Sequence, residues 1–195
     1  MKTNYSLTIL AACMLGITTV NAQAPKDDPA AIEKAWADFA TPGSMHKMMA
    51  ASNGEWNEEI TMWMSPTAPP TVSIATCTNT MIMGGRYQQS MHKGTFNNMP
   101  FEGMSIWGYN NASKTFESSW IDNMGTAIMF MEGSWDEKSK TAVFKGKSTD
   151  PVNGKITSMR EVFKIVDDNT QMMEMYESKE GKENKTMTIK FTRKK

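Results

Sequence analysis

The chain has little cysteine and little histidine, with two of each among 195 residues. Two cysteines allow at most one disulfide, and the histidines form no H-E-x-x-H motif and no Cys/His cluster with zinc-ligand spacing. No sign of charge dominates either, because 21 basic residues balance 21 acidic ones. A neutral chain without a basic stripe lacks the electrostatic footprint of a nucleic-acid-binding protein. The composition therefore predicts no metal centre, no cofactor and no nucleic-acid partner.

The sequence also has no apolar run long enough for a stable transmembrane helix. Its most apolar stretch, residues 7–20, follows the basic Lys2 and precedes a group of small residues. This order is typical of a secretion signal. We therefore predict a signal peptide over residues 1–22, cleaved after Ala22, and a secreted or periplasmic protein. Acylation of Cys13 in a lipoprotein box fits less well, because the four residues that follow it stay apolar.

Residues 23–52 are predicted to form a linker and short N-terminal helical segments. Asp28 can cap a helix that begins at Pro29, and the pattern predicts this helix over about residues 29–40. A second helical segment follows over about residues 43–52. Cys77 is the only cysteine beyond the predicted cleavage site. An exported chain with one cysteine has no internal disulfide, so its stability must come from packing.

Residues 53–195 have the pattern of a β-barrel domain. Turn-forming pairs such as Gly84-Gly85 and Asn97-Asn98 separate about ten short runs of β-forming residues. Short connections imply that neighbouring strands pair in chain order, and a long meander avoids exposed edges by closing into a barrel. We expect an all-β fold, an antiparallel up-and-down (lipocalin-like) barrel of about ten strands with one or two short N-terminal helices.

The first and last predicted strands carry a matching pair of residues. Trp56 follows Gly54 on the first strand, and Arg193 lies near the end of the last. These strands are neighbours in a closed barrel, so the guanidinium can lie over the indole in a cation–π contact worth about 0.5–2 kcal/mol. The G-x-W and terminal-Arg pattern resembles the calycin superfamily of lipocalin-like barrels. The resemblance implies structural closure, not chemistry, for both residues.

A longer resemblance covers about residues 42–194. The segments that carry it are Pro42-Gly43-x-x-His46-Lys47, Gly54-x-Trp56, Gly84-Gly85-Arg86, Pro100-Phe101-x-Gly103, Gly108-Tyr109-Asn110, Trp120-Ile121-Asp122-Asn123-x-Gly125-Thr126 and Thr192-Arg193-Lys194. Together they resemble an exported bacterial family known as domain of unknown function 1579. The resemblance implies a compact β-barrel and brings no established activity with it.

Six residues are candidates for a ligand site inside this barrel. Three aromatic residues could line a cavity or belong to ordinary core packing, and three charged residues could contact a polar ligand if they point inward. Alternation along the strands puts Asp122 and Arg160 on faces that we expect to be interior. Structural ion pairs or turn capping are the alternatives, because a buried charge needs a partner. The candidates are Arg86, Trp107, Tyr109, Trp120, Asp122 and Arg160.

Metal and haem sites have weak support in the sequence. Met45-x-x-Met48 beside His46 is the nearest match to a copper-binding pattern, but it lies in a predicted helix. Twenty methionines are explained by a soft core or an adaptable pocket, because methionine is flexible and polarizable. His92 is the only strand histidine that could hold haem, and no partner for it is evident.

The preferred functional hypothesis is a non-catalytic carrier that binds a small apolar or amphipathic molecule, with a polar or anionic end near Arg86 or Arg160. One alternative is an enzyme with a weakly marked site at the barrel mouth that uses Asp122 and His92. The other is a protein-interaction module with a filled barrel. The sequence contains no complete catalytic motif and identifies no protein partner.

Overall fold

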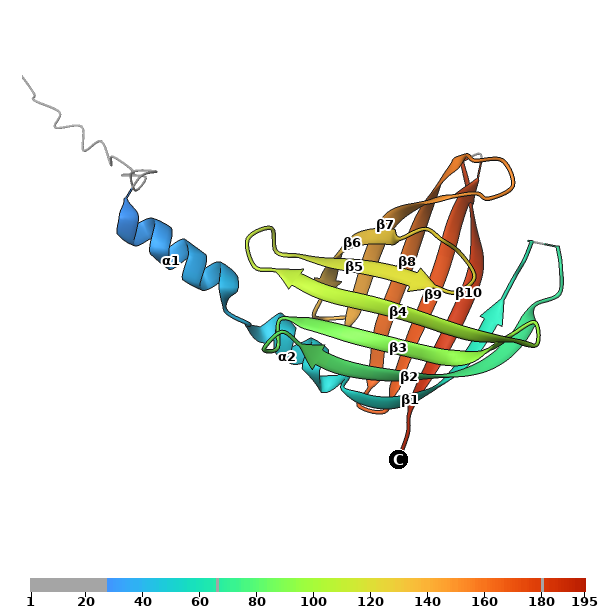
Figure 1. The fold of residues 1–195 in the computed structure, drawn as a ribbon, viewed down its shortest axis with the longest axis horizontal. Coiled ribbons are helices and arrows are strands. Elements are labelled where there is room, and N and C mark those ends of the chain that lie inside the picture. Colours follow the sequence, from blue (N-terminus) through green and yellow to red (C-terminus); the bar gives the residue numbers. More distant parts are fainter. Residues whose placement is uncertain (1–27, 66, 180) are drawn as a thin grey trace, which may run out of the picture.

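The computed structural model describes residues 28–65, 67–179 and 181–195. In these residues, ten antiparallel strands form one closed barrel that follows two short helices (Figure 1). The helices are α1 (Pro29–Ala40) and α2 (Ser44–Ala51). The strands are β1 (Gly54–Met62), β2 (Thr71–Ile82), β3 (Tyr87–Phe96), β4 (Met99–Asn110), β5 (Thr115–Asp122), β6 (Met129–Asp136), β7 (Thr141–Thr149), β8 (Ile156–Asp167), β9 (Thr170–Lys179) and β10 (Lys182–Arg193). The predicted fold class is confirmed.

Each strand pairs with the next one along the chain, and β1 pairs with β10 to close the barrel. The short connections enforce this order, because a tight turn can join only antiparallel neighbours. The turn between β2 and β3 contains Gly84 and Gly85, both with positive φ, a conformation that glycine adopts without steric cost. The meander therefore follows directly from the turn signals in the sequence.

The two helices differ in how they meet the barrel. The Asp28 carboxylate accepts a hydrogen bond from the Ala30 amide at 3.1 Å and so caps α1. None of the residues of α1 is buried, and this helix projects away from the barrel (Figure 1). In contrast, α2 contacts β2, β3 and β4 at one end of the barrel, and its Met49 is almost fully buried.

Inward amide side chains hold α2 against the barrel. Asn79 donates to the Ser52 carbonyl at 3.1 Å, Gln171 to the Ser52 hydroxyl at 2.7 Å, and Gln88 to the Met49 carbonyl at 2.5 Å. The last carbonyls of a helix have no partner within the helix, so they are available to these amides. The buried polar groups at this end satisfy one another, and α2 closes the end.

The barrel is closed by the first and last strands at the same end. Trp56 and Arg193 face each other in the register of β1 and β10, and the guanidinium carbon lies 4.3 Å from the centroid of the indole ring. Trp56 has no exposed surface, and its indole nitrogen donates to the Ser52 carbonyl at 2.9 Å. The closing contact therefore also fixes the end of α2.

No described helix combines the length and the apolar character needed to cross a membrane. The predicted signal peptide, its cleavage after Ala22 and the alternative acylation of Cys13 all concern residues 1–27, which lie outside the described residues.

Arg193 ties three separate segments together. Besides covering Trp56, its guanidinium donates to the carbonyls of Ala51, Asn53 and Asp168 at 2.7–2.9 Å. We predict that Arg193→Leu lowers the free energy of unfolding by about 2–3 kcal/mol, because it removes a cation–π contact and charged hydrogen bonds that partial exposure to solvent weakens. Chemical denaturation measures this loss.

The control is the adjacent Lys194, whose ammonium pairs with the exposed Glu55 at 2.8 Å. Exposed ion pairs contribute little, so Lys194→Ala should cost less than about 1 kcal/mol. Equal losses in the two variants would show that Arg193 has no special part in closing the barrel.

Candidate functional site

The barrel contains a cavity of about 320 Å³. This volume is near the lower end of the range of about 300–1,000 Å³ found for small-molecule pockets. At one end the cavity is bounded by Met49 and Ser52 of the α2 segment. It extends to Phe96 and Met124, which lie in β3 and in the β5–β6 loop at the opposite end. The cavity thus runs along the barrel from the closed end toward the other one.

Most of the cavity wall is apolar, with aromatic and methionine side chains from many strands. Met131, Met173 and Met175 are among the lining residues and are buried from the outer solvent. Methionine adapts to irregular apolar shapes, so such a wall can fit ligands of different outline. The methionine content of the sequence is therefore used, in part, to line this space.

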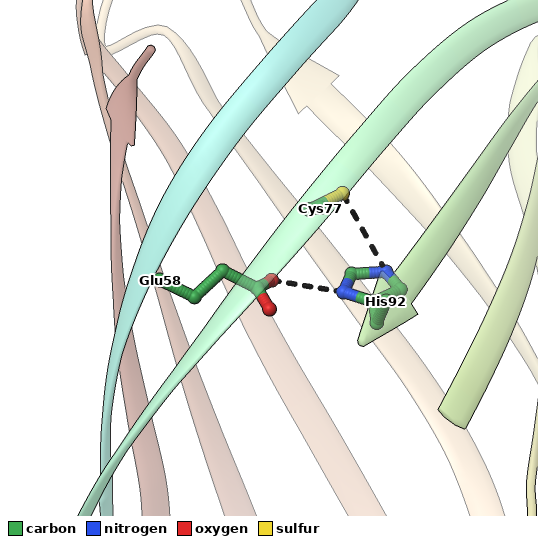
Figure 2. Close-up of side chains that lie close together, drawn as sticks. All are labelled: Glu58, Cys77 and His92. Atoms are coloured by element: carbon green, nitrogen blue, oxygen red, sulfur yellow. Dashed lines mark hydrogen bonds and ion pairs between the residues drawn. The ribbon is translucent and has the colours of Figure 1, made fainter. Parts of the chain in front are cut away.

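Three chemically active side chains lie close together (Figure 2), and all three line the cavity. Glu58, Cys77 and His92 come from the adjacent strands β1, β2 and β3. The Glu58 carboxylate lies 2.8 Å from Nδ1 of His92, and the Cys77 sulfur lies 3.8 Å from Nε2 of the same ring. The imidazole therefore bridges a carboxylate and a thiol.

Burial explains why these groups are paired. Glu58 is only 1% exposed and His92 only 8%. An isolated charge at such depth is costly, whereas a hydrogen-bonded carboxylate and imidazole satisfy each other. Burial, and then the nearby charge of Glu58, raises the pKa of the Cys77 thiol far above its ordinary value. The cysteine is therefore a protonated thiol at neutral pH.

Trp120 packs beside this cluster. Its ring centroid lies 5.0 Å from that of His92, and its indole nitrogen donates to Asp122 at 2.6 Å. Asp122 also accepts from the Met124 amide at 2.9 Å, so this carboxylate both holds the indole and caps the turn after β5. Gly103 leaves the space for the indole, because a Cβ at this position would lie 2.6 Å from the Trp120 ring.

Glu161 provides a second acidic group on a different part of the wall. It lies in β8 and lines the cavity, between Phe144 of β7 and Met175 of β9 in the strand register. Among the described residues no hydrogen-bond or ion-pair partner of its carboxylate is found. Glu161 is half-buried, with part of its surface accessible, and its loss of hydration inside the barrel raises its pKa to about 7. At neutral pH this carboxyl group is thus poised between its neutral and charged forms.

Three of the six predicted ligand residues line the cavity, namely Trp107, Trp120 and Asp122. Trp107 also packs against core aromatic rings, with its centroid 4.8 Å from that of Phe144. Tyr109 lies near the closed end instead, 4.9 Å from Phe116 between ring centroids, and it does not line the cavity.

The two predicted arginines lie outside the cavity. Arg86 is exposed in the β2–β3 turn, where it donates to the Met83 carbonyl at 3.1 Å. The expected inward position of Arg160 is wrong: its side chain pairs with Glu183 at 2.6 Å and covers the Tyr176 ring at 3.9 Å. At this point of β8 the neighbouring Glu161 faces inward instead, so the inner and outer faces of this strand are the reverse of those predicted. Arg160 therefore forms a structural ion pair, which the sequence analysis gave as the alternative to ligand contact.

His46 is a structural residue of α2. Its Nδ1 accepts a hydrogen bond from the Gly43 amide at 3.0 Å and thereby caps the start of the helix. Burial, and then the positive charge of Arg86, lowers the pKa of His46, which favours the neutral ring that can accept this bond. The Met45-x-x-Met48 pattern considered for copper lies in this same helix, and the nitrogen of His46 nearest to the backbone is already used by the cap.

Sequence reasoning missed Glu58, Cys77 and Glu161 as site residues, and it found no partner for His92. Glu58 carried a signal, because it is a charged residue on an otherwise apolar face of the first strand. Cys77 carried none, since a single buried cysteine is also common in ordinary cores. The partner of His92 depends on the register of three strands, which the pattern of one strand does not reveal.

Glu161 makes stability depend on pH in a defined direction. Its pKa is 4.5 ordinarily and about 7 in the folded protein. The folded form therefore keeps a proton that the unfolded chain releases, and the associated stability is full below pH 4.5 and lost as the pH rises through 7. We predict that Glu161→Gln removes this loss, so that at pH 8 the variant is more stable than the wild type by up to about 3 kcal/mol.

Urea denaturation at pH 4.5 and pH 8 tests this prediction, with a difference expected only at pH 8. Glu132→Gln, at an exposed position of β6, is the control and should behave like the wild type at both values. The other titratable groups of the cavity, Glu58, Cys77, His92 and Asp122, are present in all three proteins. A Glu161→Gln variant that gains nothing at pH 8 would contradict the inferred environment of Glu161.

Known structures share this barrel. Rv2717c from M. tuberculosis is similar with a TM-score of 0.60 and 10% identity, covering 80% of this chain and 100% of that one. The S-type phycobiliprotein lyase CPES from Guillardia theta has a TM-score of 0.57 and 11% identity, covering 82% and 97%. Such low identities establish a common fold alone, and no curated protein matches the sequence. The model of the family described as Protein of unknown function (DUF1579) matches residues 41–193, and the chain belongs to this family.

Proposed function

We propose that this protein binds one small, mainly apolar molecule inside its barrel, without catalysis. The observation that carries the proposal is the cavity of about 320 Å³ with its apolar, methionine-rich wall. Pockets of this kind bind small molecules through apolar contact, and a few polar groups fix the orientation. A barrel that served only as a scaffold for surface loops would have no need of this internal space.

The polar groups of the cavity favour a ligand with a hydrogen-bond donor or a positive charge. Three carboxyl groups line it, those of Glu58, Asp122 and Glu161, and no lysine or arginine does so among the described residues. Glu58 and Asp122 already accept hydrogen bonds from His92 and Trp120. Glu161 is the carboxyl group left for a ligand. The anionic end expected near Arg86 or Arg160 has no support, because both arginines lie outside the cavity.

The enzyme alternative centres on a different set of residues from the one first expected. Asp122 is held by Trp120 and the turn after β5, which leaves it a structural part of the wall. Cys77, His92 and Glu58 do follow the order of a nucleophile, a base and an orienting carboxylate. However, burial keeps the Cys77 thiol protonated, and a nucleophilic cysteine requires the opposite shift. Binding is therefore the better supported function.

We also propose that the protein acts outside the inner membrane, on the evidence of its N-terminal sequence. Mass spectrometry of the protein recovered from the periplasm or medium should identify Gln23 as its first residue. A chain that begins at an acylated Cys13 would support a lipoprotein instead. A chain that keeps residues 1–22 would contradict export by cleavage.

Ligand preference can be tested with a matched pair of probes. Decylamine and decanoate have the same chain length and opposite charge, and each can displace the neutral fluorescent dye N-phenylnaphthylamine. We predict that decylamine competes at least about 10-fold better than decanoate at pH 8, because a charge-assisted hydrogen bond to Glu161 is worth about 1.5–3 kcal/mol. Fluorescence titration of the purified, lipid-extracted protein measures both affinities.

The variants separate the cavity from the outer surface. Glu161→Gln should remove the preference for the amine while keeping dye binding, and the exposed Glu132→Gln should keep the preference. Failure of the dye to bind, or equal affinities for the two probes in the wild type, would contradict the proposed ligand class.

A further inference from the structure

Donor atoms of three different kinds converge on the polar side of the cavity. Ligand atoms of Glu58, Cys77 and His92 all lie within 4.8 Å of one another. Asn79 lies beside this group, and its Oδ1 accepts a hydrogen bond from the Cys77 thiol at 3.1 Å. All four residues are buried and all line the cavity. A sulfur, a nitrogen and oxygens in one small volume form the donor set of a transition-metal site.

The distances fit one particular arrangement of these donors. In tetrahedral zinc sites the Zn–S and Zn–N bonds are about 2.3 and 2.0–2.1 Å, which places the sulfur and nitrogen about 3.5 Å apart. The Cys77 sulfur and Nε2 of His92 are 3.8 Å apart, so a small approach of the two side chains would accommodate the ion. The Asn79 amide nitrogen donates to the Ser52 carbonyl at 3.1 Å, which holds Oδ1 against the Cys77 thiol. Once zinc displaces the thiol proton, this oxygen can serve as a third ligand.

Glu58 then has a separate and complementary part. Its carboxylate lies 2.8 Å from Nδ1 of His92, on the other side of the ring from the sulfur. A carboxylate in this position fixes the ring and its tautomer and makes the opposite nitrogen a better ligand. This arrangement of carboxylate, histidine and metal position recurs in zinc proteins. It also explains why the buried pair is placed beside the only described cysteine.

We propose that Cys77 and His92, with Asn79, bind one zinc ion, that Glu58 orients His92, and that the remaining coordination position faces the cavity. Zinc displaces the thiol proton of Cys77, which is released to solvent, so binding should tighten as the pH rises. The resulting thiolate selects a borderline or soft metal over magnesium or calcium, and the imidazole and oxygen donors favour zinc over copper(I). Three protein ligands with one open position are typical of zinc sites that accept water or a small ligand. The site goes beyond the binding of an apolar ligand, which needs no metal.

Zinc and cobalt(II) titrations of the metal-free protein test this proposal. We expect one zinc per chain in competition with a chromophoric chelator, and with cobalt(II) a thiolate-to-metal charge-transfer absorption in the near ultraviolet. Cys77→Ser should remove this absorption, and His92→Gln should remove tight zinc binding. Glu58→Gln should weaken zinc affinity by about 10–100-fold while keeping the absorption, as expected for a residue that orients a ligand.

A matched control guards against metal bound elsewhere. Glu59→Gln changes the exposed residue next to Glu58 and should bind zinc like the wild type. Circular dichroism establishes that each variant is folded. The proposal is overturned if the folded wild type gives no thiolate absorption with cobalt(II), or if Cys77→Ser and His92→Gln still bind zinc as tightly as the wild type. The wild-type spectrum decides the matter even where a variant fails to fold.

Discussion

The structure depends on one constraint above all: a polar group inside a barrel has no access to bulk water and must find a partner there. Asn79, Gln88 and Gln171 meet this constraint by donating to the end of α2, which closes the barrel. Glu58 meets it by pairing with His92. The same requirement therefore positions the helix that closes one end and the cluster that marks the cavity.

Glu161 is the exception, and its unpartnered carboxyl group determines which ligand charge the cavity favours. It lies on the wall formed by β8, and no described residue bonds to its carboxylate. A protein that keeps an unpaired carboxyl group in an apolar cavity loses stability at neutral and higher pH, because the group must ionise without a partner. Such a loss is understandable if a ligand with a donor or a positive charge supplies the partner, so the stability of the barrel is linked to its proposed function.

The fold could be predicted from the sequence because its signals are local. Turn residues such as Gly84 and Gly85 separate the strands, and the meander order follows from the short connections. The closing pair, Trp56 and Arg193, could be matched because a closed barrel fixes which strands are its first and last neighbours. For the aromatic residues the sequence left cavity lining and core packing open, and the structure shows Trp107 and Trp120 at the cavity but not Tyr109.

The candidate site was harder to predict because it depends on which face of a strand each residue takes and on the register between paired strands. Arg160 was assigned to the interior through its apolar strand neighbours, but the inward residue is the adjacent Glu161, and a step of one residue exchanges the two faces of a strand. Cys77 and His92 face each other only because β2 and β3 pair in one particular register. No pattern within a single strand contains this information.

If the cavity is the proposed binding site, we expect it to be occupied in the cell. Native mass spectrometry of the protein purified without detergent, before and after extraction with organic solvent, tests it most directly. We expect a discrete adduct on the folded chain that disappears on extraction, with a mass that identifies the class of ligand. A folded protein that has the mass of the bare chain in both samples would contradict the claim.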